Sequence, residues 1–281
     1  RDGLLQWKRY LTDRGIQVTG PYNRKYFTSI YFRDPDGQVV EIATDGPGFT
    51  VDEAADALGS DVQTPLADAT RGSRDQAQIE AETWPERVPE ITPAMALRQG
   101  MHHISAISSD VERTHAFFGD LLGMQRVKKT FNYDDPDSAH WYWGVDGGRP
   151  GTLITYFGRN PETERRARMG AGQTHHFALA VKDEEEQLAW RERLVSAGFG
   201  VSPVMDRVYF KSIYTQDPDG HIVELATWGP GFQLDEDDAR LGTGLMLPPW
   251  LEARRATIEQ KLKPLQVPER PFAQTVTEET R

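Results

Sequence analysis

The stretch that decides the fold runs from Arg207 to Phe232 and reads RVYFKSIYTQDPDGHIVELATWGPGF. Its first part, Tyr209–Thr215, is rich in aromatic and β-branched residues, which favour a β-strand. Asp217–Gly220 then has the composition of a tight turn, in which glycine adopts a positive φ. A second strand is predicted over Ile222–Ala226, and one carboxylate, Glu224, interrupts its apolar run. Because an isolated buried charge is costly, Glu224 must be paired, exposed or bound to a cation.

The same stretch occurs a second time, 183 positions earlier and without a gap, so that Arg24 corresponds to Arg207. The match extends from Trp7 to Gly59, which corresponds to Gly242. An ungapped repeat of this length indicates a duplicated domain, and its period is far too long for a solenoid.

Composition narrows the class of protein. The chain has 281 residues, 38% of them hydrophobic, and no apolar run long enough for a membrane helix. It contains no cysteine, which excludes disulfides and thiolate chemistry, and it shows no signal-peptide pattern. These features agree with a cytoplasmic location. The net charge of -11 argues against a nucleic-acid partner. Because Arg1 already lies inside the repeat, we expect that the upstream part of the first unit is missing.

The chain divides by pattern into five segments. Residues 1–60 predict a helix over Leu4–Arg14, a strand at Ile16–Thr19 and the hairpin. Residues 61–99 are acidic and lack periodicity, which indicates a linker with at most one short helix. Residues 100–165 and 166–245 each predict the order β-α-β-β-β, with helices capped at Ser109–Glu112 and Asp183–Glu186. A strap, a short helix and a polar tail are expected over 246–281.

Two histidine pairs open the first strands of the two βαβββ segments, His102–His103 and His175–His176. Adjacent strand residues face opposite sides, so at most one of each pair is expected in a given cleft. If the segments pack face to face, one histidine from each can meet Glu224. Two imidazoles and one carboxylate form the ligand set that suits Fe(II), with Mn(II) as an alternative, and leave positions open for substrate and O₂. Taken singly, each histidine pair could be a surface feature and Glu224 a salt-bridged carboxylate.

Several motifs together resemble the vicinal oxygen chelate superfamily, and within it the hydroquinone ring-cleaving dioxygenases. They are GMHHIS at 100–105, VKKTFNYDDP at 127–136, PGTLITYF at 150–157, HHFA at 175–178, VELAT at 223–227 and LPPWLE at 247–252. The resemblance covers residues 1–60 and 100–265. It implies an α+β fold of tandem βαβββ modules packed as paired curved mixed sheets. The implied activity is extradiol-type cleavage of a small aromatic diol, a hydroquinone or catechol, by O₂.

The resemblance also implies roles for individual residues. The metal ligands would be His103, His176 and Glu224. Groups that contact the substrate or assist catalysis would be His102, His175, Arg207 and Tyr214. A histidine can exchange a proton with a phenol near neutral pH, whereas an arginine can stabilise a phenolate.

One departure from the family leaves the ligand set open. The family's two His-His units lie at opposite ends of the chain, whereas here they are adjacent. The first copy of the repeat keeps Arg24, Tyr31 and Glu41 but no histidine, so His103 can pair with Glu41 or with Glu224. Of the other histidines, His140 is expected in the core, and His115 and His221 are expected to face solvent.

Two other functions remain open. The scaffold also supports metal-dependent isomerases and lyases of the glyoxalase kind. A non-catalytic protein that binds an aromatic ligand is a third alternative. An exposed half-domain at the start of the chain would favour pairing with another chain, as in a homo-oligomer, or low stability.

Overall fold

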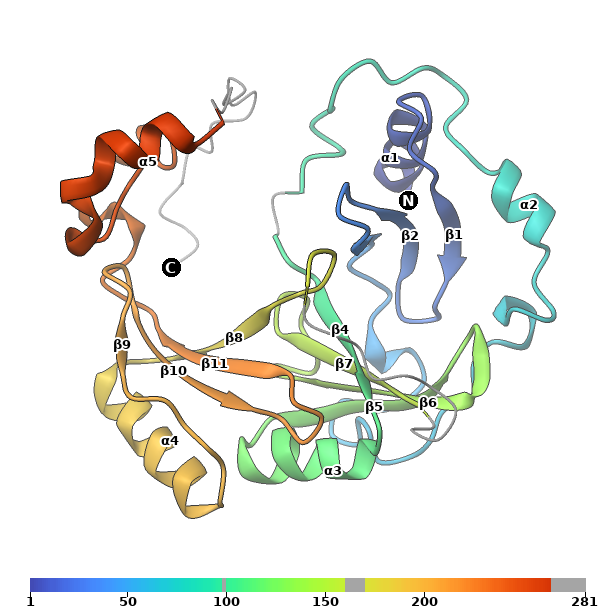
Figure 1. Cartoon of the computed structure of the whole chain (residues 1–281). Helices are drawn as coiled ribbons and strands as arrows, with labels where there is room; N and C mark the ends of the chain where they lie inside the picture. The colour runs from blue at the N-terminus through green and yellow to red at the C-terminus, as the bar shows by residue number, and fades with distance from the viewer. Residues whose placement is uncertain (98–99, 160–169, 264–281) are drawn as a thin grey trace. The chain divides into compact units, whose positions relative to one another are not determined.

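The structure is a computed structural model that describes residues 1–97, 100–159 and 170–263 (Figure 1). The chain forms two compact units. The first comprises Arg1–His175 with the turn Asp217–His221, and the second comprises His176–Gln216 with the chain from Ile222 onward. The polar tail expected at the end of the chain lies outside the described residues.

The first unit begins with a helix on a three-stranded antiparallel sheet. Helix α1 (Asp2–Thr12) is followed by β1 (Thr19–Asn23), β2 (Thr28–Arg33) and β3 (Val39–Ala43), which lie in the order β1-β2-β3. Leu4 of α1 packs against Ile30 and Ile42 of the sheet. The first strand was expected at Ile16–Thr19 but begins at Thr19 and contains Pro21. A proline has no N–H to donate, and it fits here because β1 is an edge strand.

A complete β-α-β-β-β module follows in the same unit. It consists of β4 (His103–Ser108), α3 (Val111–His115), β5 (Gln125–Asn132), β6 (Asp135–Gly144) and β7 (Leu153–Gly158). The strand order is β4-β7-β6-β5, with β4 parallel to β7 and the other pairs antiparallel. Helix α3 continues as a π-helical turn over Ala116–Leu121. Its N-cap is Asp110, not Ser109 as expected, because the Asp110 carboxylate accepts from the N–H groups of Glu112 and Arg113.

The N-terminal sheet and the β4–β7 module share one hydrophobic core. Residues from both sides form this cluster, namely Tyr26, Phe27, Phe49, Leu58, Val127, Tyr142 and Leu153. The fully buried Lys128 lies beside the cluster and forms ion pairs with Asp52, at 2.6 Å, and Glu53. Its ammonium group also donates to the Phe49 carbonyl at 3.1 Å. Residues 1–60 therefore pack against 103–158 through apolar burial and a buried charge network.

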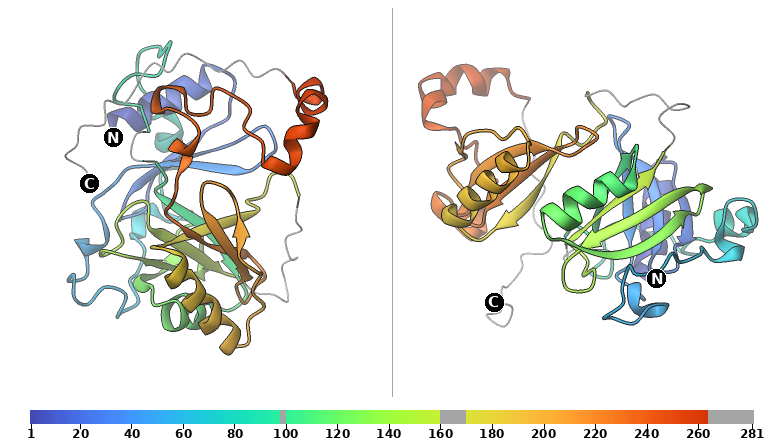
Figure 2. Two further views of the ribbon diagram at one scale, coloured as in Figure 1. Left: turned by 90° about the vertical axis from the view of Figure 1, so that its left-hand side faces the viewer. Right: turned by 90° about the horizontal axis from the view of Figure 1, so that it is seen from below.

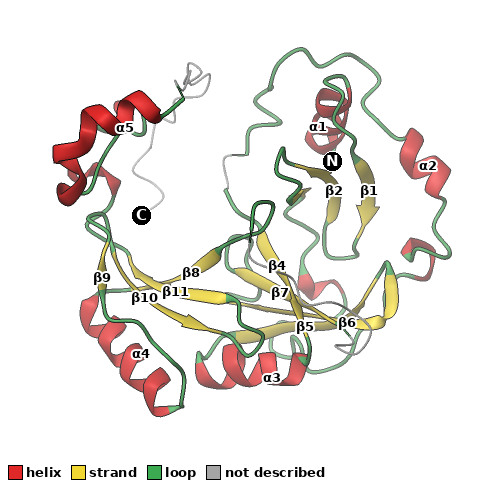
Figure 3. Cartoon of the chain, in the orientation of Figure 1, coloured by secondary structure: helices red, strands yellow, loops and turns green. Residues whose placement is uncertain are grey.

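The acidic segment between these parts consists mainly of loops (Figure 3), and it is packed against the rest of the first unit. Its expected short helix is α2 (Gln76–Ala81). The buried Lys8 donates to four backbone carbonyl oxygens, three of them in or just after α2. Trp7 donates through its indole N–H to the carbonyl of Met95 at 2.7 Å. These hydrogen bonds hold the segment against α1.

The second unit has the same order of elements as the β4–β7 module. It contains β8 (His176–Val181), α4 (Glu184–Ser196), β9 (Met205–Asp206), β10 (Lys211–Gln216) and β11 (Ile222–Thr227), in the order β8-β11-β10-β9. Figure 2 shows α4 along one face of this sheet. Asp183 caps α4 as expected, but the strand expected near Val201 is replaced by the short β9. A 3-10 helix (Pro249–Arg254) and α5 (Arg255–Lys261) follow. None of the described helices is long and apolar enough to cross a membrane.

Candidate metal centre

A histidine and a carboxylate meet inside the first unit. Nε2 of His103, the first residue of β4, lies 3.1 Å from Oε2 of Glu41 on β3. The side chains of both residues are largely buried, at 8% and 17% exposed. Burial acts to raise the pKa of Glu41, but the hydrogen bonds from His103 and Tyr31 outweigh it and hold the pKa below its ordinary value. The carboxylate therefore stays ionised and can attract a cation.

A tyrosine and an arginine support this carboxylate. Tyr31 lies directly opposite Glu41 in the β2–β3 pair and donates its hydroxyl to Oε1 at 3.0 Å. Arg24 in turn donates to the Tyr31 hydroxyl at 3.2 Å and forms an ion pair with Asp134 at 3.1 Å. Arg74 holds the other oxygen of Asp134. Oε1 of Glu41 thus accepts the hydrogen bond from the Tyr31 hydroxyl, and Oε2 faces His103.

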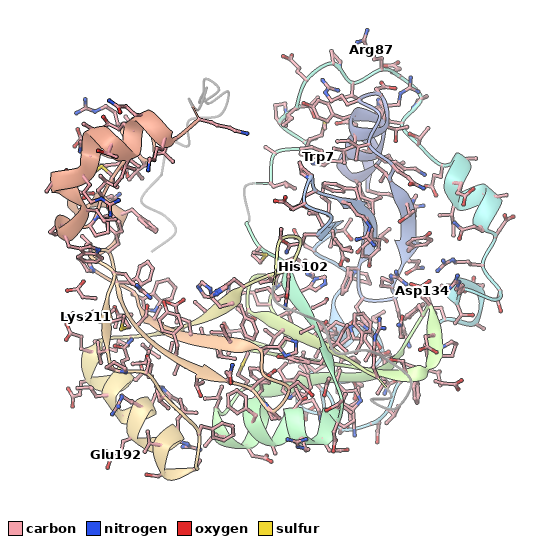
Figure 4. The ribbon with its side chains drawn as sticks, in the orientation of Figure 1. Trp7, Arg87, His102, Asp134, Glu192 and Lys211 are labelled. Carbon is pink, nitrogen blue, oxygen red and sulfur yellow. The ribbon has the colours of Figure 1, made fainter. Side chains whose placement is uncertain are left out.

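His102 lies next to His103, on the side of β4 that faces the N-terminal sheet (Figure 4). The Nδ1 atoms of the two rings are 2.9 Å apart, and both rings pack against Phe27, with centroids 5.0 and 5.3 Å away. We expected only one of the pair in a given cleft. His102 precedes the regular strand β4, and the expectation about the cleft stays a prediction. Burial and the nearby His103 lower the pKa of His102, which favours a neutral ring at pH 7.

His140 belongs to the core, as its place among aromatic residues indicated. It is stacked on Phe157 and accepts or donates hydrogen bonds with Tyr142 and Thr155, each at 3.1 Å. Burial lowers its pKa well below the ordinary value. No sequence pattern indicates the roles of Asp134 and Arg74, since the ion pairs that join Asp134 to Arg24 and Arg74 depend on the packing of distant segments.

The second unit repeats the arrangement. Nε2 of His176 on β8 lies 2.9 Å from Oε2 of Glu224 on β11. Tyr214, opposite Glu224 in the β10–β11 pair, donates to Oε1 at 3.0 Å, and Arg207 donates to the Tyr214 hydroxyl. Ser212 forms a further short hydrogen bond to the same carboxylate. His176 is more exposed than His103, with 38% of its side chain accessible.

The structure thus distributes the sequence-predicted residues over two half-sites. His102 and His103 lie with Glu41 in the first unit, and His176, Arg207, Tyr214 and Glu224 lie together in the second. His175 is exposed and immediately precedes β8. The alternative that joins His103 to Glu41 is the one that the structure displays.

Two other histidines differ from expectation. His115 does not simply face solvent, because it is half-buried and its Nδ1 accepts a hydrogen bond from the Trp143 indole at 3.0 Å. His221 forms a hydrogen bond through Nδ1 with the carboxyl group of the buried Asp217 at 2.9 Å. Both therefore have structural partners.

The donor chemistry fits a divalent metal such as Fe(II). In each unit one imidazole nitrogen lies close to one carboxylate oxygen, at 3.1 Å in the first unit and 2.9 Å in the second. These two atoms supply two of the three ligands of a 2-His-1-carboxylate centre. Among the described residues, no group of three or more histidine or acidic side chains comes together. A complete centre therefore needs one more ligand at either half-site.

The chain is similar to known dioxygenases in sequence. The model of the Glyoxalase/Bleomycin resistance protein/Dioxygenase superfamily matches residues 100–225. MhqO of Bacillus subtilis, named provisionally as a ring-cleaving dioxygenase, is 36% identical over 190 residues, which cover 68% of this chain and 56% of MhqO. The chlorohydroquinone/hydroquinone 1,2-dioxygenase of Sphingobium indicum is 30% identical over 142 residues, which cover 50% of this chain and 41% of that enzyme.

The fold of the chain is similar to that of one solved structure. A Bacillus subtilis protein named provisionally as a dioxygenase aligns with a TM-score of 0.67 and 26% identity, and the alignment covers 96% of this chain and 72% of the other. This chain spans about half the length of MhqO.

Proposed function

We propose that the protein is a metal-dependent dioxygenase that opens the ring of a hydroquinone or catechol with O₂. Residues 100–225 of the chain belong to the Glyoxalase/Bleomycin resistance protein/Dioxygenase superfamily, which supports this proposal. The observation that carries the proposal is the histidine–carboxylate pair, which recurs in both units with the same tyrosine and arginine behind the carboxylate. The names of the relatives supply the reaction class.

The metal would be Fe(II), held by His103 with Glu41 in the first unit and by His176 with Glu224 in the second. The sequence-based triad of His103, His176 and Glu224 remains an alternative proposal for how three ligands meet. When bound, the metal would hold the diol and O₂ side by side and let electrons pass between them.

The residues around the metal would prepare the diol for this reaction. His102 has a lowered pKa and is therefore free to accept a proton from a phenolic hydroxyl at neutral pH. In the second unit His175 would take that role. Arg24 and Arg207 each donate to a tyrosine hydroxyl, and each would act through this tyrosine to fix the orientation of the carboxylate.

Oxygen consumption tests the proposal. The protein is loaded anaerobically with Fe(II) and mixed with methylhydroquinone in an oxygen electrode cell, as wild type, Glu41→Gln and Glu224→Gln. Glu192→Gln is the control, because Glu192 is exposed on α4, away from both carboxylates along the chain (Figure 4).

The expected result is oxygen uptake by the wild type and the control, and a loss of roughly tenfold or more in whichever variant removes a working ligand. A loss in only one variant would locate the site in that unit. Stoichiometric iron without oxygen uptake in the wild type would refute the proposal, and binding of the diol without turnover would favour the binding-protein alternative.

A further inference from the structure

Glu41 lies at the end of a continuous chain of hydrogen bonds. The Tyr31 hydroxyl donates to Oε1 of Glu41 at 3.0 Å, and Nε of Arg24 donates to that hydroxyl at 3.2 Å. Nη2 of the same guanidinium group donates to Oδ2 of Asp134 at 3.1 Å. Arg74 donates to the other oxygen of Asp134, Oδ1, at 2.5 Å. These five residues are called the Arg74 relay below.

The Arg74 relay joins three parts of the first unit. Arg74 belongs to the acidic segment 61–99, and Asp134 lies in the turn between β5 and β6 (Figure 4). The other members lie on β2 and β3 or in the connection between β1 and β2. The acidic segment, which the sequence indicates as a linker, therefore contacts the groups that support Glu41.

Arg74 is held in this position by several contacts. Its side chain is only 8% exposed, and its guanidinium group lies over the ring of Tyr22, 4.2 Å from the centroid. Its Nε donates to the side-chain oxygen of Gln76 at 3.0 Å, and the amide of Gln76 donates to the Tyr22 hydroxyl at 3.3 Å. Because Tyr22 belongs to β1, these contacts hold Arg74 against the sheet that carries Glu41.

Asp134 is shared by two arginines, one on each carboxylate oxygen. Burial acts to raise the pKa of Asp134, but Arg24 and Arg74 outweigh it and hold the pKa below its ordinary value. An arginine frequently forms two parallel hydrogen bonds to one carboxylate. Because Arg74 occupies Oδ1, Arg24 contacts Asp134 through Nη2, and its Nε is available to the Tyr31 hydroxyl. Without Arg74, both nitrogens of Arg24 could turn to Asp134 and leave Tyr31.

The second unit has the last part of this chain of contacts without its beginning. Tyr214 donates to Glu224 at 3.0 Å, and Arg207 donates to the Tyr214 hydroxyl through both Nε and Nη2, at 3.3 and 3.2 Å. Arg207 is exposed, and in the described part of the chain it forms no ion pair with a carboxylate. Met205 stands at the position that corresponds to Tyr22. A fixed arginine is therefore a property of the first half-site.

We propose that Arg74 and Asp134 are positioning residues for Glu41, and that the acidic segment thereby raises the metal affinity of the first half-site. The effect on metal affinity rests on the proposed function, whereas the effect on the contact between Arg24 and Tyr31 does not. Because coupling between two sites is reciprocal, metal binding at Glu41 should in turn hold the acidic segment more firmly.

A double-mutant cycle on metal affinity tests the proposal. Every protein carries Glu224→Gln, which removes the carboxylate of the second half-site. Fe(II) binding is measured anaerobically in competition with a chromophoric chelator. The cycle consists of Arg74→Met, Tyr31→Phe and the double variant, and Arg74→Lys keeps a cation that can still contact Oδ1 of Asp134. Arg71→Met is the control, because Arg71 is an exposed arginine of the same segment.

The proposal predicts that Arg74→Met lowers the Fe(II) affinity about three- to thirtyfold, that Arg74→Lys loses less, and that Arg71→Met has no effect. In the Tyr31→Phe background, Arg74→Met should cause no further loss, because the relay is already interrupted. Equal losses in both backgrounds would mean that Arg74 does not act through Tyr31, and they would overturn the proposal. An unchanged affinity in Arg74→Met would also overturn it, since the ion pair would then only tether the segment.

A second readout needs no metal. Tyrosine labelled with ¹³C at Cζ is incorporated, and the Tyr31 signal is identified by its loss in Tyr31→Phe. In the metal-free protein this signal should shift in Arg74→Met and in Asp134→Asn but not in Arg71→Met, because Arg24 leaves the hydroxyl. An unshifted Tyr31 signal would overturn the positioning role. Failure of the Glu224→Gln parent to bind Fe(II) would instead refute the proposed metal site, and a shifted Tyr31 signal would still support the positioning role.

Discussion

Replacement of Lys128 by methionine is the most informative test of the packing in the first unit. The side chain of Lys128 is completely buried and pairs with Asp52 at 2.6 Å and with Glu53. Removal of one partner from a buried ion pair leaves uncompensated charges and typically costs about 3–5 kcal/mol. Lys25 also pairs with Asp52 at 2.6 Å, but its side chain is 19% exposed. Because solvent partly screens this pair, Lys25→Met should cost less than Lys128→Met, about 1 kcal/mol.

The pH dependence of this loss follows from Asp52. Burial raises the pKa of Asp52, but the hydrogen bonds from Lys128, Lys25 and Tyr26 outweigh it and hold the pKa below the ordinary value of 3.8. A carboxyl whose pKa is lowered by folding contributes stability above its unfolded pKa, and this contribution is lost as the pH falls through the folded pKa. The stabilities of wild type and Lys128→Met should therefore converge as the pH drops below 3.8.

The assay must resolve the two units, because a single midpoint is not well defined for a chain with two units. Hydrogen exchange of peptides from β5 and β6, measured at increasing urea, reports the stability of the first unit alone. A loss of about 3 kcal/mol corresponds to a more than hundredfold change in the opening equilibrium. Equal losses of stability in Lys128→Met and Lys25→Met would show that the buried charge of Lys128 is not what stabilises this core.

Three further substitutions test the tight packing at Gly59 and the support of Glu41 by Tyr31. Gly59→Ala should destabilise the first unit by more than about 2 kcal/mol, because the φ of Gly59 is +70° and a Cβ would lie 2.2 Å from the carbonyl oxygen of Arg126. Gly242 has a similar φ of +69° but open space around it, so Gly242→Ala should cost about 1 kcal/mol. Urea denaturation measures both losses. Tyr31→Phe removes the hydroxyl that donates to Glu41, so Fe(II) affinity of the first unit should fall about 10- to 100-fold in a competition titration with a chromophoric chelator. An unchanged Fe(II) affinity would show that the Tyr31 hydroxyl does not contribute to the metal site.

The hairpin and the repeat could be predicted because their signals are local. The turn at Asp217–Gly220 and the apolar run that follows it need no knowledge of distant segments, and β10 and β11 lie within one or two residues of the prediction. The strand starts were less predictable. Pro21 belongs to β1 only because this strand is at the sheet edge, and edge position is a property of the whole sheet.

The partner of His103 could not be predicted from the sequence. Glu41 and Glu224 occupy equivalent positions of the repeat, and their local surroundings are nearly the same. The choice depends on which copy packs on the β4–β7 module. The first unit shows that residues 1–60 do so, with Phe49 and the carboxylates of Asp52 and Glu53 as contacts.

The buried role of Lys128 was missed for a related reason. Two adjacent lysines at the middle of a strand resemble an exposed, charged edge. The alternation of the strand separates them, so that Lys128 turns inward while Lys129 is partly exposed. Only the carboxylates from residues 52 and 53, more than seventy positions away, make that inward position stable.

The most direct test of the central claim is the fate of labelled oxygen. The Fe(II)-loaded protein is given methylhydroquinone under ¹⁸O₂, and the product is examined by mass spectrometry. We predict a ring-opened acid that retains label from O₂, formed by the wild type and lost when the histidine–carboxylate pair that binds iron is removed. An unlabelled isomer of the substrate, or recovery of intact diol from an iron-bound protein, would contradict the assignment as a ring-cleaving dioxygenase.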